Sequence, residues 1–123
     1  MNEAMKQKIE NGEVFLGIEL GSTRIKAVLI DNTYAPIASG GYNWENRLED
    51  GYWTYHLDDV WTGVQTSFRE LAKDVSERYG AALTKVVSMG VSAMMHGYLA
   101  FDKEGNQLCP FRTRRNTTTE KAA

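Results

Sequence analysis

The beginning of the chain alternates short apolar runs with short polar turns. Residues 14–20 are apolar except for Gly17 and Glu19, and residues 25–30 are rich in β-branched and aliphatic side chains. These two runs flank the polar stretch 21–24, and their composition is typical of β-strands. Residues 37–44 form a third candidate strand, which two glycines weaken. A parallel return needs a crossover of about a dozen residues or more, so strands joined this closely run antiparallel. We therefore predict a three-stranded antiparallel meander.

From Leu57 the hydrophobic period changes to that of an α-helix, which we expect to continue to Tyr79. Asp58 or Asp59 can cap its beginning, and Gly80 suits its end. The residues expected on its buried stripe, with Trp61 assigned to the core, are Leu57, Val60, Trp61, Val64, Phe68, Leu71, Ala72, Val75 and Tyr79.

The apolar run after the helix, residues 85–92, predicts a buried strand that is parallel to a neighbour. Residues 97–102 and 106–111 flank the turn sequence KEGN and predict two further short strands. Residues 47–56 contain several aromatic side chains and are expected to form a loop. The whole pattern indicates an α/β fold with a mixed sheet that starts with the meander, followed by a long helix and a buried parallel strand.

The two ends of the chain differ from its middle. Residues 1–13 are polar and are expected to be a leader that is mobile or partly helical, so that the domain begins at residue 14. Thr117 and Glu120 have the spacing of a capping box, which predicts that a helix begins near the end of the chain. A helix that short is not stable by itself, so these residues alone are typical of a frayed tail. Together with the motifs described below, they favour a chain cut from a longer protein.

Composition and charge exclude several classes of protein. The chain has 123 residues, 42% of them hydrophobic and 24% charged, and a net charge of −2, so no basic excess points to nucleic acid. Cys109 is the only cysteine, which rules out an intrachain disulfide. The sequence shows neither a run of about 20 apolar residues that could cross a membrane nor an apolar secretory segment. A cytoplasmic protein without a membrane or nucleic-acid partner is expected.

The turn between the first two strands carries candidate chemistry. Successive backbone N–H groups in a tight turn can form a nest for an anion, and Gly21 would let a ligand approach the backbone. Ser22 and Thr23 add hydroxyl donors, while Lys26 adds a positive charge suited to phosphate. Glu19 could then hold a metal-bound water, because Mg²⁺ keeps most of its waters and uses few protein carboxylates. The alternative is an ordinary hairpin turn, and the spacing of a Walker P-loop is absent.

Outside this turn, few residues suggest a site. Met95 and His96 come just after the predicted parallel strand, where α/β folds place ligand contacts, although a lone histidine is more often structural. His56 is interpreted as a surface residue. Arg112 begins a local basic cluster, with Arg114 and Arg115, that could be a solvated turn or could grip a sugar or a phosphate.

Taken together, the pattern resembles the FGGY family of carbohydrate kinases, which have actin-like domains. Four stretches carry the resemblance: LGIELGSTRIKAVLID, EDGYWTYHLDDVWTGVQTSFRELA, VVSMGVSAMMHGYLAFDKEGNQLCP and PFRTRRNTTTEKAA. The resemblance implies that residues 14–123 are the N-terminal part of the first of two ribonuclease H-like, actin-like domains. It further implies ATP and Mg²⁺ as cofactors, a sugar or polyol as the substrate, and transfer of the γ-phosphoryl group to a hydroxyl; a homodimer is left open.

The resemblance also assigns residues. Gly21, Ser22, Thr23 and Lys26 would face the phosphates, and Glu19 would serve the metal. Met95, His96 and Asn116 would contact the sugar. No catalytic residue is assigned, because the family's catalytic aspartate is expected beyond residue 123, and the fragment alone is expected to be inactive and to expose apolar surface or self-associate.

Departures from the family pattern leave the substrate open. Glu19 stands where the family has Asp, Met94 where xylulokinase-like members have Gln, Arg114 at a tryptophan position and Asn116 where many members have Asp. Candidate substrates are pentoses, hexoses, sugar acids and polyols. Three other classes are alternatives: a chaperone or filament ATPase of the same superfamily, a ribonuclease H-like metal-dependent nuclease, and a small non-catalytic binding module.

Overall fold

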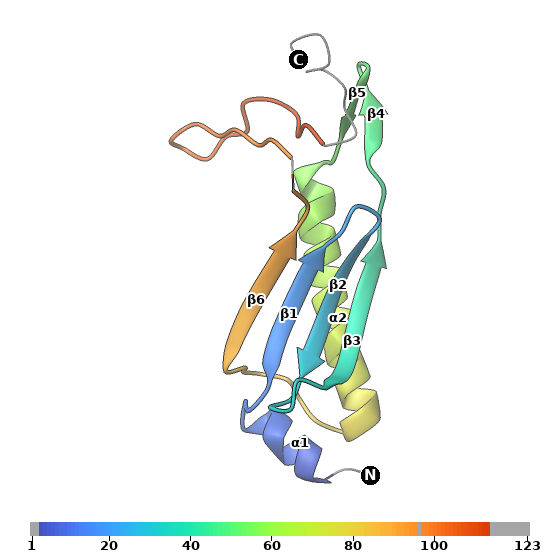
Figure 1. The fold of residues 1–123 in the computed structure, drawn as a ribbon, viewed down its shortest axis with the longest axis vertical. Coiled ribbons are helices and arrows are strands. Elements are labelled where there is room, and N and C mark those ends of the chain that lie inside the picture. The colour runs from blue at the N-terminus through green and yellow to red at the C-terminus, as the bar shows by residue number, and fades with distance from the viewer. Residues whose placement is uncertain (1–2, 96, 114–123) are drawn as a thin grey trace.

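The chain folds into a mixed α/β arrangement (Figure 1). The structure, a computed structural model, describes residues 3–95 and 97–113. The helices and strands of this part are α1 (Glu3–Glu10), β1 (Phe15–Leu20), β2 (Arg24–Ile30), β3 (Pro36–Asn43), β4 (Arg47–Glu49), β5 (Tyr52–Thr54), α2 (Leu57–Tyr79) and β6 (Ser88–Ala93). Neither described helix is long and apolar enough to cross a membrane.

The main sheet has the strand order β3-β2-β1-β6. β1 pairs antiparallel with β2, and β2 with β3, so the predicted meander is confirmed. β6 pairs parallel with β1, in a register that places Ser92 beside Glu19. The predicted parallel strand is therefore confirmed, and α2 provides the long crossover that a parallel return requires.

Helix α2 packs on β2 and β3 at unusually close range. A Cβ added at Gly40 would lie 2.3 Å from both the Leu71 nitrogen and the Ser67 oxygen of the helix backbone. The buried residues along the contact include Gly63 and Ser67, and the Ser67 hydroxyl donates to the Ile25 carbonyl at 3.0 Å. Small residues at the contact line thus let the helix lie directly against the sheet.

This close contact overturns the assignment of Trp61 to the core. Its side chain is 62% exposed, because it precedes Gly63 by two residues and a turn has about 3.6 residues, which puts the two on opposite sides of the helix. The predicted end at Gly80 is confirmed, with a left-handed φ of 64°. The residue before the helix is His56, without a side-chain capping bond, so neither Asp58 nor Asp59 is the cap.

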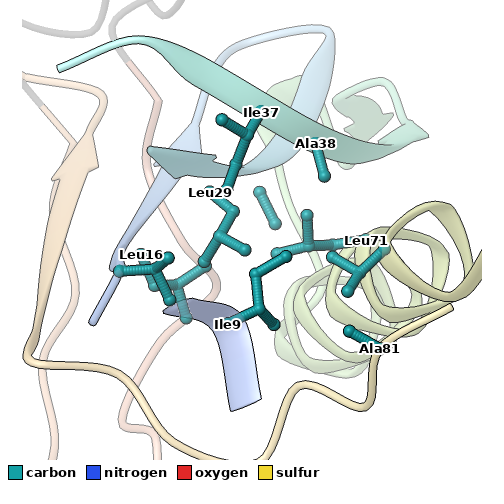
Figure 2. Packing of buried hydrophobic residues seen from close by; sticks show 10 residues of the cluster. Ile9, Leu16, Leu29, Ile37, Ala38, Leu71 and Ala81 are labelled. Atoms are coloured by element: carbon teal, nitrogen blue, oxygen red, sulfur yellow. The ribbon is translucent and has the colours of Figure 1, made fainter. Parts of the chain in front are cut away.

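The core joins α1 to the sheet and α2. Figure 2 shows Ile9 of α1, Leu29 of β2 and Leu71 of α2 converging, and all three are fully buried. Of the two possibilities for residues 1–13, helical or mobile, the structure shows a helix for Glu3–Glu10. The cluster comprises Ile9, Val14, Leu16, Ala27, Leu29, Ile37, Ala38, Leu71, Val75 and Ala81.

Two loop regions differ from expectation. Residues 47–56 contain the hairpin β4–β5 rather than a plain loop, and its turn holds Asp50 and Gly51 at φ of 51° and 81°. Two such left-handed residues match the twist of a two-residue hairpin. Residues 97–111 form isolated bridges, such as that between Phe101 and Gln107, rather than regular strands. The turn predicted between them is present, with Asp102 accepting hydrogen bonds from the following backbone.

Strand β6 was expected to be buried, but every one of its residues is exposed. Met89 and Val91 are 59% and 61% exposed, and Val87 just before the strand is 61% exposed. The cause is that α2 contacts β2 and β3, and no other helix of the described part lies over β6. The apolar surface that the sequence led us to expect is therefore present.

We predict that Gly40→Ala destabilises the fold, because the new methyl group would collide with the backbone of α2. Overpacking of this kind costs about 1–3 kcal/mol, measured as a loss in the free energy of unfolding by urea titration followed by circular dichroism. Gly90→Ala on β6 is the matched control, since a Cβ there meets nothing within 4 Å. Equal stability of the two variants would contradict the close packing.

We also predict a pH-dependent contribution from Asp74. The Ser39 N–H donates to its carboxylate at 3.0 Å and Arg78 pairs with it at 2.8 Å, and these two contacts hold the pKa of Asp74 below its ordinary value of 3.8. A carboxyl with a lowered folded-state pKa stabilises the fold above its unfolded pKa, and this contribution is lost as the pH falls through the folded value. Asp74→Asn should therefore lower stability more at pH 6 than at pH 3, in urea titrations at both pH values. The control is Glu77→Gln, and an Asp74→Asn deficit that is the same at both pH values would contradict the prediction.

Candidate functional site

The turn of residues 21–23 joins β1 to β2 at the carboxyl end of β1. Because β6 runs parallel to β1, both strands finish at this end of the sheet, where the β4–β5 hairpin and the segment after β6 also lie (Figure 1). The turn is closed by a hydrogen bond from the Gly21 N–H to the Arg24 carbonyl at 2.9 Å. The topology therefore brings the predicted phosphate turn and the predicted sugar segment to the same end of the molecule.

All three carbonyls of the turn accept hydrogen bonds from two buried aromatic residues. The donors are the side chains of Trp44 and Tyr55 and the backbone N–H of Trp44. The Trp44 indole N–H donates to the Gly21 carbonyl at 2.8 Å, and the Trp44 backbone N–H donates to the Thr23 carbonyl at 3.1 Å. The Tyr55 hydroxyl donates to the Ser22 carbonyl at 2.6 Å. Trp44 and Tyr55 are 7% and 3% exposed, and their ring centroids lie 4.2 Å apart. The carbonyl side of the turn is thus fixed from the protein interior.

The amide side of the turn faces the solvent. Ser22 and Thr23 are exposed, and among the described residues neither N–H group has a hydrogen-bond acceptor. Gly21 is different, because its N–H closes the turn. The geometry therefore leaves two backbone donors, rather than three, for an anion.

Glu19 and Lys26 stand next to this turn. They are register partners across β1 and β2, both are exposed, and within residues 3–95 and 97–113 neither belongs to a salt bridge. A Cβ at Gly21 would lie 3.5 Å from the Glu19 carboxylate and 2.9 Å from the Arg24 carbonyl. Glycine thus keeps open the space between the turn and the carboxylate.

The two side chains border a shallow hollow on the exposed face of the sheet. Its lining residues are Gly17, Ile18, Glu19, Lys26, Val28, Gly90, Val91 and Ser92. In the described part of the chain, no group of three or more histidine, cysteine or acidic residues could hold a metal ion. A single carboxylate next to a hydroxyl fits Mg²⁺ that keeps most of its waters and also binds phosphate oxygens, so Glu19 fits that metal only together with a second ligand.

The predicted sugar residues are described only in part. Met95, two residues after β6, is 68% exposed, which leaves its side chain accessible. His96 and Asn116 lie outside the described residues, as do Arg114, Arg115 and the capping box that begins at Thr117. Arg112 lies over the Tyr52 ring, 4.2 Å from its centroid, and the backbones of Arg112 and Tyr98 pair.

Sequence reasoning missed the two residues that hold the turn, Trp44 and Tyr55. A signal was available, because a buried Trp N–H or Tyr O–H needs a hydrogen-bond partner; which carbonyl it meets depends on the fold. His56 was interpreted as a surface residue, and its side chain is 40% exposed, but its ring nitrogen lies 2.7 Å from the Glu49 carboxylate.

One comparison with known proteins identifies a family. Residues 14–123 match the model of the N-terminal domain of the FGGY family of carbohydrate kinases. A comparison with curated protein sequences gives no significant match.

Solved structures share the fold at low sequence identity. Glycerol kinase with ADP from Plasmodium falciparum superposes with a TM-score of 0.70 at 18% identity, over 89% of this chain and 22% of that chain. A xyloylose kinase from Brucella ovis gives 0.67 at 22% identity, over 80% and 20%. Gluconate kinase from Lactobacillus acidophilus gives 0.65 at 19% identity, over 81% and 19%. The chain spans about a fifth of the length of these kinases.

Proposed function

Because the chain belongs to the FGGY family of carbohydrate kinases, we propose that it supplies the phosphate-binding part of an ATP-dependent sugar kinase. The observation that carries the proposal is the turn after β1. Its carbonyls bond inward to Trp44 and Tyr55, while two amides face outward next to Lys26 and Glu19. Fixed donors next to a cation are what phosphoryl transfer requires of a protein, since the reaction depends on positioning and on charge stabilisation.

Each residue of the turn has a proposed role. The Ser22 and Thr23 amides and hydroxyls would donate to oxygens of the nucleotide phosphates, and Lys26 would offset their negative charge. Glu19 would hold a water on Mg²⁺, which neutralises charge on the phosphates when it is bound. Glu19 has a longer side chain than the family's usual Asp, and its carboxylate lies near Gly21, so the acid would act beside the turn.

The acceptor would be a hydroxyl of a sugar or a polyol. We propose that Met95, His96 and Asn116 contact it, since the segment after β6 begins at the same end of the sheet as the turn. The solved relatives are named as kinases of glycerol, gluconate and xyloylose, and these compounds differ in length and charge. The substrate class is therefore a small polyhydroxy compound, and the cytoplasm, which contains ATP, is the proposed location.

The chain alone would bind phosphate without catalysing its transfer. It spans about a fifth of the solved kinases, and the catalytic aspartate and most of the adenosine pocket are expected elsewhere in a longer protein. General-base catalysis alone contributes about 10²–10⁴ in rate. The proposal therefore concerns the longer protein that carries this domain.

The function is tested on that full-length protein with a coupled assay of ADP release over a panel of pentoses, hexoses, sugar acids and polyols. We expect Mg²⁺-dependent release with one group of substrates, and no release from the 123-residue chain assayed alongside. Absence of release with every compound would contradict the proposal. Mg²⁺-dependent cleavage of RNA or DNA by the same preparation would favour the nuclease alternative instead.

We predict that Lys26→Ala weakens the use of ATP more than the affinity for sugar. A hydrogen bond to a charged group contributes about 1.5–3 kcal/mol, which corresponds to a change of about tenfold to a hundredfold in KM for ATP or in kcat/KM. The KM for sugar should stay within about threefold, which separate titrations of the two substrates would measure.

The matched control for Lys26→Ala is Lys73→Ala, which removes an exposed lysine of α2 that does not line the hollow. It should leave both KM values unchanged. Equal loss for the two substrates in Lys26→Ala would contradict the assignment of Lys26 to the phosphates.

A further inference from the structure

A second hydrophobic cluster lies at the site end of the molecule, separate from the main core. Its buried members are Ile25, Trp44 and Tyr55, and Met94 and Phe111 are among the partly buried residues that pack against it. Met94 directly follows β6, and Phe111 belongs to the segment that returns toward the β4–β5 hairpin. The cluster therefore touches both the phosphate turn and the segment proposed to contact the sugar.

On the side of the turn, the orientation of the Tyr55 hydroxyl is determined by two contacts. The Asn46 side-chain amide donates to this hydroxyl at 3.3 Å, and the hydroxyl donates to the Ser22 carbonyl at 2.6 Å. Because the oxygen accepts from Asn46, its single hydrogen is available for Ser22. The position of the Tyr55 ring therefore determines the position of the Ser22 peptide, whose neighbouring N–H groups face outward.

On the sugar side, Phe111 holds the Tyr55 ring. The two rings meet edge to face, with centroids 5.6 Å apart and planes at 70°, a favourable aromatic geometry. A Cβ at Gly97 would lie 2.6 Å from the Phe111 ring, so Gly97 lies directly against this ring. Met94 and Gly97 thus both contact the cluster.

We propose that Tyr55 is a positioning residue, and that it supports both the phosphate turn of residues 21–23 and the segment after β6 that is proposed to contact the sugar. Tyr55 fixes the Ser22 peptide by its hydroxyl, and Phe111 fixes Tyr55 by its ring. Packed side chains transmit small displacements because interiors have few voids. A displacement of Met94 or Gly97 on sugar binding would therefore shift Phe111, Tyr55 and the turn together. This inference rests on the proposed kinase function and names the residues that link its two substrate sites.

The test uses the full-length protein and two variants that act at different points of this support. Tyr55→Phe removes the bond to Ser22 and keeps the ring, so it should raise KM for ATP and Kd for MgADP about fivefold, the effect of one neutral hydrogen bond, with KM for sugar within twofold. Phe111→Leu removes the ring that contacts both Tyr55 and Gly97, so it should raise both KM values. Kd for MgADP is measured by isothermal titration, a readout that needs no turnover.

The matched control is Tyr34→Phe, which removes the hydroxyl of a tyrosine that is 80% exposed and should change neither constant. If the wild type is active and Tyr55→Phe has the constants of Tyr34→Phe, the positioning role is overturned while the kinase function stands. If Tyr55→Phe only lowers the folded fraction in urea titrations, and the folded remainder keeps wild-type constants, its role is structural and the inference also falls. A wild type that neither binds MgADP nor phosphorylates any sugar overturns the proposed function itself.

Discussion

The close contact between α2 and β3 at Gly40 sets how near the helix lies to the sheet. A helix can approach a sheet this closely only where side chains are small, and here Gly40 faces the backbone at Ser67 and Leu71. The contact fixes the position of α2 along the sheet, and therefore also the position of the residues just before the helix. Tyr55 lies two residues before Leu57, so the same contact places its hydroxyl under the turn between β1 and β2.

In the turn between β1 and β2, the backbone carbonyl groups point inward and the Ser22 and Thr23 N–H groups point outward. A buried carbonyl without a partner is costly, and the three carbonyls of residues 21–23 are bonded by Trp44 and Tyr55. With the carbonyls held inside, the Ser22 and Thr23 amides are directed to the outside without local partners. The proposed anion site therefore depends on the direction in which the backbone is held more than on the side chains of the turn.

Regular elements of the fold could be predicted from the sequence, because each has a local cause. Short connections imposed the meander, the apolar period indicated α2, and Gly80 ended it in the left-handed conformation. The hairpin at Asp50 and Gly51 could also have been found, since this dipeptide suits the two left-handed positions that the turn requires. The aromatic residues around it suggested a loop instead.

The remaining differences depend on tertiary contacts that no local pattern contains. Trp61 fits the apolar stripe of α2, but the helix is oriented so that Gly63 and Ser67, rather than Trp61, face the sheet. Ile9 stands in a polar segment and is nevertheless fully buried, because α1 places it against Leu29 and Leu71. Of the site, the sequence indicated the turn and its charged neighbours. It could not indicate which carbonyls Trp44 and Tyr55 bond, because those carbonyls are distant in the chain.

The charged residues of the hollow complement the outward-facing amides. Glu19 and Lys26 stand opposite each other on neighbouring strands, and no salt bridge involves either of them within the described residues. Each is therefore available to a ligand of opposite charge, Lys26 to a phosphate and Glu19 to a hydrated cation. A phosphate that carries Mg²⁺ presents both charges at once, so it can pair with the Lys26 ammonium and the Glu19 carboxylate together. Either ion alone would leave one of these side chains without its counter-charge.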